Sequence, residues 1–149
     1  MNTNTLKKAV LGVVAVVALG ACGSGTDAIS VESAWARTSP MSSDAGAIYM
    51  TITSPNDDAL VSAAVDMSVA MMTQVHETTM NADGTMGMQE VDEVALPAGN
   101  AVALEPGGFH IMLMGLKQPL VLGDTVEVVL TFKSGEEISV DAEVRDEAP

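Results

Sequence analysis

With 149 residues the chain has the length of one domain, and 20 acidic residues against 6 basic ones give it a formal net charge of −14. This excess of negative charge argues against nucleic-acid binding and against adhesion to anionic lipid through a basic patch. The single cysteine, Cys22, has no partner for an internal disulfide, so a packed core must stabilise the fold.

The first residues predict export and lipid anchoring. Residues 1–21 combine a positively charged start with an apolar run that is too short to span a membrane. Residues 19–22 (LGAC) resemble the bacterial lipobox, in which Cys22 carries lipid and holds the mature protein on the outer face of the cell membrane. Ordinary cleavage nearby, which would leave a free thiol, is the alternative. Residues 22–28 are expected to form a flexible tether, and residues 29–149 a single β domain.

Beyond the tether, short segments of alternating apolar and polar residues predict strands separated by turn residues. The expected strands are, in chain order, 29–37, 47–53, 60–66, 74–78, 85–91, 101–104, 109–116, 125–132 and 138–144. No segment shows a helical period of apolar residues. About eight to ten short strands predict an all-β sandwich or barrel of the Greek-key type.

One stretch does not fit this pattern clearly. Residues 67–72 (MSVAMM) suit a short helical turn or an irregular crossover equally well. Aromatic residues are scarce, at 3% of the chain, so methionine is expected to replace them as apolar filler. Met50, Met67, Met71 and Met72 are interpreted in this way.

The chain has only two histidines, and both lie close to methionines. His110, Met112 and Met114 occupy alternate positions, so in a strand their side chains share one face. His76 and Met88 flank a turn of sequence Asn-Ala-Asp-Gly, and a hairpin there brings them together. The pattern predicts a surface at which two imidazoles and several thioethers converge.

Such a donor set suits Cu(I). Methionine sulfur is soft and polarisable, whereas Mg²⁺ and Ca²⁺ prefer oxygen ligands and Zn²⁺ seldom accepts a thioether. Because all these donors are neutral, the site lacks the thiolate that would hold copper more tightly. A carrier that loads and unloads its ion is therefore favoured over a permanent cofactor site, with Cu(II) kept as an alternative occupant.

Other functions fit the residues less well. Blue-copper electron transfer needs a cysteine thiolate beside two histidines, and there is no cysteine after Cys22. The zinc-protease motif HExxH would need a histidine at position 80, which is Met80. Neither histidine lies in a nucleophile-and-orienter setting, so we expect a protein that is not an enzyme. A structural β domain with incidental methionines stays open as an alternative.

The spacing of four residues resembles that of a known family. His76 is followed after 12 positions by Met88, after 22 more by His110 and after 2 more by Met112. This pattern, with the flanking segments AIYMTI and PGGFHIMLMGL, resembles the PCuAC family of bacterial extracytoplasmic copper chaperones over roughly residues 31–144. That family often has methionine directly after its first histidine, where this chain has Glu77.

The resemblance implies a cupredoxin-like copper-binding domain whose solvent-accessible site holds one Cu(I) through His76, Met88, His110 and Met112. It also implies delivery of copper outside the cytoplasm, towards cytochrome c oxidase subunit II or a Sco-type protein. Copper buffering, or a structural lipoprotein without a delivery role, is the alternative.

Two further thioethers lie near the expected ligands. Met86 and Met114 are each two residues from a predicted ligand, on the same strand face. We expect them to pack against the ligands or to exchange with them.

Overall fold

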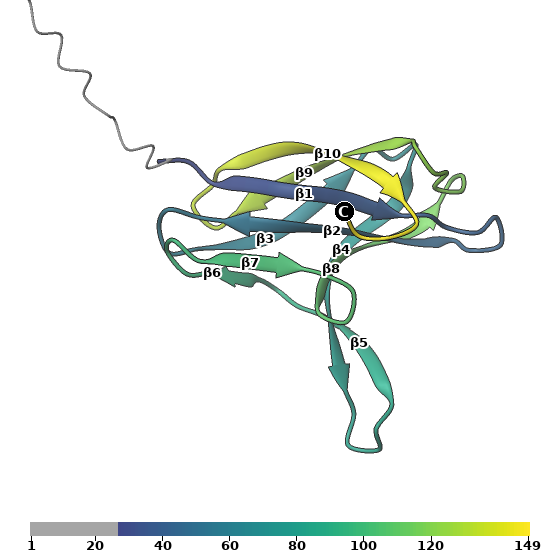
Figure 1. The fold of residues 1–149 in the computed structure, drawn as a ribbon, viewed down its shortest axis with the longest axis horizontal. Coiled ribbons are helices and arrows are strands. Elements are labelled where there is room, and N and C mark those ends of the chain that lie inside the picture. The colour runs from purple at the N-terminus through teal and green to yellow at the C-terminus, as the bar shows by residue number, and fades with distance from the viewer. Residues whose placement is uncertain (1–26) are drawn as a thin grey trace, which may run out of the picture.

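The computed structural model describes residues 27–149, and the expected signal segment 1–21, Cys22 and most of the expected tether lie outside these residues. The described residues confirm the all-β prediction (Figure 1). The strands are β1 (Ser30–Arg37), β2 (Ala45–Thr53), β3 (Asp58–Val65), β4 (Ala70–Met80), β5 (Met86–Glu90), β6 (Val94–Leu96), β7 (Ala101–Leu104), β8 (Phe109–Leu116), β9 (Thr125–Phe132) and β10 (Glu137–Arg145). Among residues 27–149, no helix has the length and apolar character that crossing a membrane requires.

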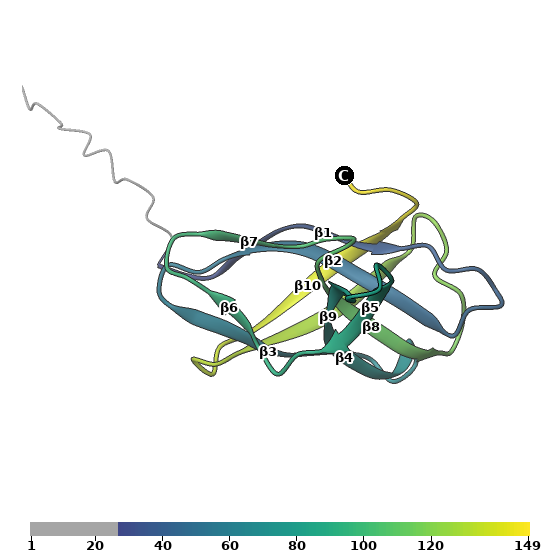
Figure 2. The ribbon, with the colours of Figure 1, turned by 90° about the horizontal axis from the view of Figure 1, so that it is seen from below.

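The strands belong to one 10-stranded sheet in the order β5-β4-β8-β7-β2-β1-β10-β9-β3-β6, and β8 also pairs with β2. The β1–β10 and β7–β8 ladders are parallel, and the β2–β8 and β4–β8 ladders are antiparallel. The sheet curls over into two layers (Figure 2). β3 and β4 approach each other without forming a ladder, so the barrel stays open there. This cupredoxin-like arrangement places β4 between β5 and β8.

Alternating residues of each strand fill the core between the layers. Ile48, Met50 and Ile52 of β2 are at most 2% exposed, so Met50 is apolar filler as predicted. In β8, Ile111 and Leu113 are fully buried. Because successive side chains of a strand point to opposite faces, this burial turns the alternate residues of β8 to the other face of the sheet.

Three other methionines are not core filler, and this prediction was wrong. Met67, Met71 and Met72 are 77%, 66% and 54% exposed. The structure resolves the ambiguous segment into a turn followed by the start of β4 at Ala70. Met67 lies in that turn, and Met71 and Met72 are exposed at the start of β4. The apolar character of methionine did not show which face of the strand it would occupy.

Strand β6 was also not predicted. It has only three residues, and it pairs with the beginning of β3 through Asp58–Leu96 and Leu60–Val94. Val94 and Leu96 are buried, with Ala95 exposed between them. A strand this short shows too little alternation to be recognised in the sequence.

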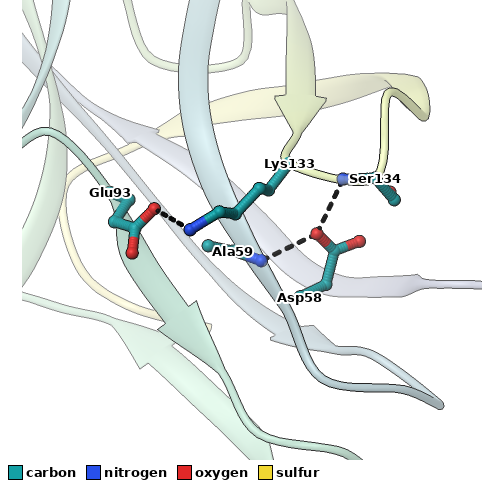
Figure 3. A network of polar contacts seen from close by, with 5 residues as sticks. All are labelled: Asp58, Ala59, Glu93, Lys133 and Ser134. Carbon is teal, nitrogen blue, oxygen red and sulfur yellow. Dashed lines mark hydrogen bonds and ion pairs between the residues drawn. The ribbon is translucent and has the colours of Figure 1, made fainter.

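A polar network fixes the turn between β9 and β10 to β3 (Figure 3). An oxygen of Asp58 accepts hydrogen bonds from the backbone N–H groups of Ala59, at 2.8 Å, and of Ser134, at 3.0 Å. Nearby, the ammonium group of Lys133 lies 2.9 Å from a carboxylate oxygen of Glu93, just before β6. These contacts join three segments that are distant in the sequence and fix β3, the start of β6 and the β9–β10 turn to one another.

The β4–β5 hairpin stands away from the body of the barrel (Figure 1) and points towards the viewer in Figure 2. Its turn is closed by a 2.8 Å hydrogen bond from Asn81 N–H to Thr85 C=O. Gly84 has a φ of 82°, a left-handed conformation that suits glycine. The predicted Asn-Ala-Asp-Gly turn is therefore confirmed, and it projects a hairpin into solvent.

Candidate metal centre

The two histidines face each other across neighbouring strands. In the antiparallel β4–β8 ladder His76 is directly opposite His110. Their ring centroids are 5.9 Å apart, with the ring planes inclined by 48°. A metal-bound imidazole nitrogen lies about 2 Å from its ion, so two rings at this separation can share one ion. His110 is only 4% exposed, and His76 is half-buried.

The two predicted methionine ligands come from the strands on either side of β4. Met112 lies on β8, two residues from His110, and Met88 lies on β5. Together with His110 and residues 45–47 of β2, both methionines line an open hollow of about 170 Å³. The structure therefore gathers Met88, His110 and Met112 around one space, with His76 directly opposite His110.

Hydrogen bonds define which nitrogen of each ring carries a proton. Nε2 of His76 is 3.0 Å from Oε1 of Gln74, and Nδ1 of His110 is 3.2 Å from the carbonyl oxygen of Gly108. With the Gln74 amide in this orientation both partners are oxygen acceptors, which assigns the protons to these two nitrogens. The lone pairs are left on Nδ1 of His76 and Nε2 of His110.

One of these lone pairs is buried without a partner. Among the side-chain atoms of residues 27–149, Nδ1 of His76 is the buried nitrogen for which no hydrogen bond is found. Burying a polar atom without a hydrogen bond is unfavourable, and such an atom in a native structure needs an explanation. A bound ion would supply the missing interaction.

The surroundings of His110 keep its imidazole neutral. Burial lowers the pKa of His110 below its ordinary value, the hydrogen bond to Gly108 acts in the opposite direction, and His76 lowers it further. Two buried aromatic residues continue across the sheet from this ring, on β2 and β1: Tyr49 lies 6.4 Å from His110 and Trp35 lies 4.8 Å from Tyr49, measured between ring centroids. Neutral imidazole is the form that binds metal ions.

Met86 and Met114, which were expected to pack against the ligands or to exchange with them, lie on opposite sides of this centre. Met86 is directly opposite Met80 near the hairpin turn and is 65% exposed. Met114 is half-buried on β8, opposite Met72 on one side and Ala45 on the other. Neither lines the hollow of the centre, and each forms a pair with another residue of the same face.

Two groups of the site were missed from the sequence. Gln74 and the carbonyl of Gly108 each hold one histidine ring, and neither was predicted. Gln74 is two residues before His76 on the same strand, so the alternation of β4 could have placed it on the metal-facing side. The sequence gives no comparable indication for a backbone carbonyl. Within residues 27–149, no three His, Cys, Asp or Glu side chains gather into a group that could hold a metal ion.

Known proteins resemble this chain in both sequence and fold. The family described as "Putative lipoprotein LpqE-like" matches residues 29–144. The "Putative lipoprotein Lxx21020" of Leifsonia xyli subsp. xyli (strain CTCB07) is 34% identical over 125 residues, which are 83% of this chain and 74% of that protein.

Two solved structures are similar to this chain in fold. The apo PCuAC domain from PmoF1 is 26% identical, with a TM-score of 0.66 over 81% of this chain and 94% of that domain. The Cu(I) form of DR1885 from Deinococcus radiodurans is 34% identical, with a TM-score of 0.62 over 83% of this chain and 84% of that one. The expected likeness to PCuAC domains is therefore confirmed.

Proposed function

The chain belongs to the LpqE-like lipoprotein family and has the fold of PCuAC domains, and from this premise we propose that it is an extracytoplasmic copper carrier. It binds one Cu(I) through His76, Met88, His110 and Met112, and it passes the ion to an acceptor protein. It acts by binding and transfer, and it is not an enzyme.

The observation that carries this proposal is the pair of imidazoles that lie directly opposite each other on β4 and β8, with ring centroids 5.9 Å apart. The lone pair on buried Nδ1 of His76 has no partner. In His110 the hydrogen bond to Gly108 is made by Nδ1, so Nε2 does not take part in it. Thioethers of Met88 and Met112 border the same hollow as His110. Two nitrogen and two sulfur donors without charge match Cu(I), and the solved relative DR1885 is described in a Cu(I) form.

The exposure of the centre supports transfer rather than permanent storage. Met88 is 62% exposed, and the hollow opens to solvent. An incoming ligand from an acceptor can therefore reach the ion and replace one thioether at a time. None of the four donors has to gain or lose a proton when it releases Cu(I). Cu(II) remains an alternative occupant, since imidazole also suits that ion.

The acceptor is proposed from the family resemblance alone. Cytochrome c oxidase subunit II or a Sco-type protein would receive the ion outside the cytoplasm. The alternative is a copper-buffering or structural lipoprotein without delivery. Mixing the loaded protein with each metal-free acceptor and measuring copper in the separated proteins distinguishes these roles, because a buffering protein would keep its copper in both mixtures.

The place of action follows from the first residues. We propose that residues 1–21 are removed as a lipoprotein signal, that Cys22 carries lipid, and that residues 22–28 tether the copper-binding domain 29–149 to the outer face of the membrane. The lipoprotein relative supports this arrangement. Mass spectrometry of the N-terminal peptide from native material decides it, and an unmodified Cys22 would end the claim.

The copper site is tested by an anaerobic competition titration with a Cu(I) chelator. We expect His76→Ala/His110→Ala to abolish high-affinity binding, whereas Met41→Leu/Met67→Leu, two exposed methionines outside the centre, leaves it unchanged. X-ray absorption of the loaded protein should show both nitrogen and sulfur neighbours. Undiminished affinity in the double histidine variant would refute the proposed site.

A further inference from the structure

Three methionines extend from the metal centre along the solvent-exposed hairpin. Met80 and Met86 are directly opposite each other next to the turn, and Met88 follows two residues further along β5. The three are 75%, 65% and 62% exposed, so none of them fills a core. Because residues opposite each other in a ladder and residues two apart in a strand share a face, all three thioethers lie on the same side of the hairpin.

Their spacing allows one ion to contact all three. Residues directly opposite in an antiparallel pair have Cβ atoms about 4.5–5.5 Å apart, and diagonal neighbours are about 7–8 Å apart. Met80 and Met86 form the direct pair, and Met80 and Met88 form the diagonal. Methionine is unbranched with three rotatable bonds, so its sulfur can move by the few ångströms that separate these positions.

The opposite face of the hairpin shows that this arrangement is not a general preference for methionine. That face carries Glu77 paired with Gln89, and Thr79 paired with Gly87. Both faces stand in solvent near the turn, yet the thioethers gather only on the face that continues into the metal centre. Exposed apolar side chains clustered at one place mark an interaction site more often than isolated ones do.

We propose that Met80, Met86 and Met88 form a second, weaker Cu(I) site at the end of the hairpin, and that copper leaves the protein through it. This inference rests on the proposed copper-carrier function and specifies its route of release. With the first site filled, Met88 is already a ligand there, and Met80 and Met86 alone hold the second ion. When an ion moves out of the first site, Met88 moves with it and completes the second site. During transfer the bonds from copper to His76, His110 and Met112 break as bonds to the sulfurs of Met80 and Met86 form.

This exchange is balanced without any other reactant. Copper stays in the +1 state and binds only uncharged donors in both sites, so the exchange needs no oxidant or reductant. The second site has only thioethers and is open to solvent, whereas the first has two imidazoles, one of them almost fully buried. The first site therefore binds more tightly, and an acceptor that contacts the hairpin end draws the ion outward through the weaker site.

The test counts Cu(I) equivalents on the full domain under anaerobic conditions, with Cu(I) added as its acetonitrile complex. We expect wild type to bind a second, weaker equivalent. We expect Met80→Leu/Met86→Leu to lose that equivalent while the tighter one, which depends on the imidazoles, remains. Met41→Leu/Met67→Leu is the matched control, because it removes two exposed thioethers elsewhere and should keep both equivalents.

The variant His76→Ala/His110→Ala separates the two proposals. It should lose the tight equivalent and retain the weak one, and X-ray absorption of that retained copper should show sulfur neighbours without imidazole. A wild-type protein that binds a single equivalent, or a second equivalent that survives Met80→Leu/Met86→Leu, overturns the hairpin site and leaves the carrier function standing. Tight binding that survives loss of both histidines overturns the carrier site instead.

Discussion

Gln74 gives the sharpest test of how the centre is organised. Its side-chain oxygen accepts the Nε2–H proton of His76 at 3.0 Å and thereby leaves the lone pair on the buried Nδ1. In the Gln74→Leu variant this acceptor is absent, although the side chain keeps a similar volume. The ring of His76 can then rotate, or carry its proton on Nδ1, and either change removes a donor from the ion.

The expected magnitude follows from the role of such a contact. Losing the group that orients a metal-binding histidine lowers metal affinity by roughly 10–100-fold. This corresponds to about 1.4–2.8 kcal/mol of binding free energy. We therefore expect Gln74→Leu to weaken Cu(I) binding within this range and not to abolish it, since the other three donors are untouched. Gln74→Glu keeps an acceptor oxygen and should retain most of the affinity.

The assay is the Cu(I) competition titration, combined with ¹⁵N spectra of the histidine rings in the metal-free protein. Gln89→Leu is the matched control, because Gln89 lies on β5 opposite Glu77, on the other face of the hairpin. The spectra should show the proton of His76 on Nε2 in wild type and a mixture of tautomers in Gln74→Leu. Wild-type affinity in Gln74→Leu, or equal losses in Gln74→Leu and Gln74→Glu, would refute the positioning role.

Three further predictions concern stability. Burial lowers the pKa of His110, so this histidine binds a proton more readily in the unfolded chain, and the metal-free protein should lose stability as the pH falls from about 6.5 through that lowered pKa. Urea unfolding midpoints at several pH values measure this loss. His110→Asn should make the midpoint depend less steeply on pH. Ile111→Ala empties a fully buried core position and should lower the free energy of unfolding by about 2–5 kcal/mol in urea titrations. Gly115→Ala should destabilise the protein by about 1–2 kcal/mol. Gly115 has a φ of 65°, and a Cβ there would lie 3.0 Å from the side chain of Met71. An unchanged thermal midpoint would contradict this prediction.

The local features of the fold could be predicted from the sequence because each depends on neighbouring residues. Alternation in β2 placed Ile48 and Ile52 in the core, and alternation in β8 put His110 and Met112 on one face. The Asn-Ala-Asp-Gly turn indicated the β4–β5 hairpin. Burial and turn conformation are decided within a few residues in these cases, so a single sequence contains the necessary information.

The details that could not be predicted, including the register that aligns the two histidines, depend on pairing between distant segments. The alignment of His76 with His110 is set by the β4–β8 ladder, and a shift of one residue would turn one ring to the other side of the sheet. Nothing within β4 or β8 alone fixes that register. The role of Gln74 follows only once His76 has been placed. Met71 and Met72 are successive residues of β4, so their side chains point to opposite faces, and nothing in the nearby sequence shows that both stay exposed.

The shape of the β4–β5 hairpin explains how Met88 reaches the same hollow as Met112. Met88 and Met112 lie two strands apart, on opposite sides of the His76–His110 pair along the strand direction. In a flat sheet their backbones would be separated by roughly 9–10 Å across the strands and about 13 Å along them, too far for one ion. Nevertheless both residues line the same hollow. The β4–β5 hairpin and β8 therefore do not lie in a flat sheet, and the twist between them helps to bring the two thioethers to one hollow. Met88 is the donor carried on this projecting element, so it is the ligand best placed to leave the imidazoles together with its ion.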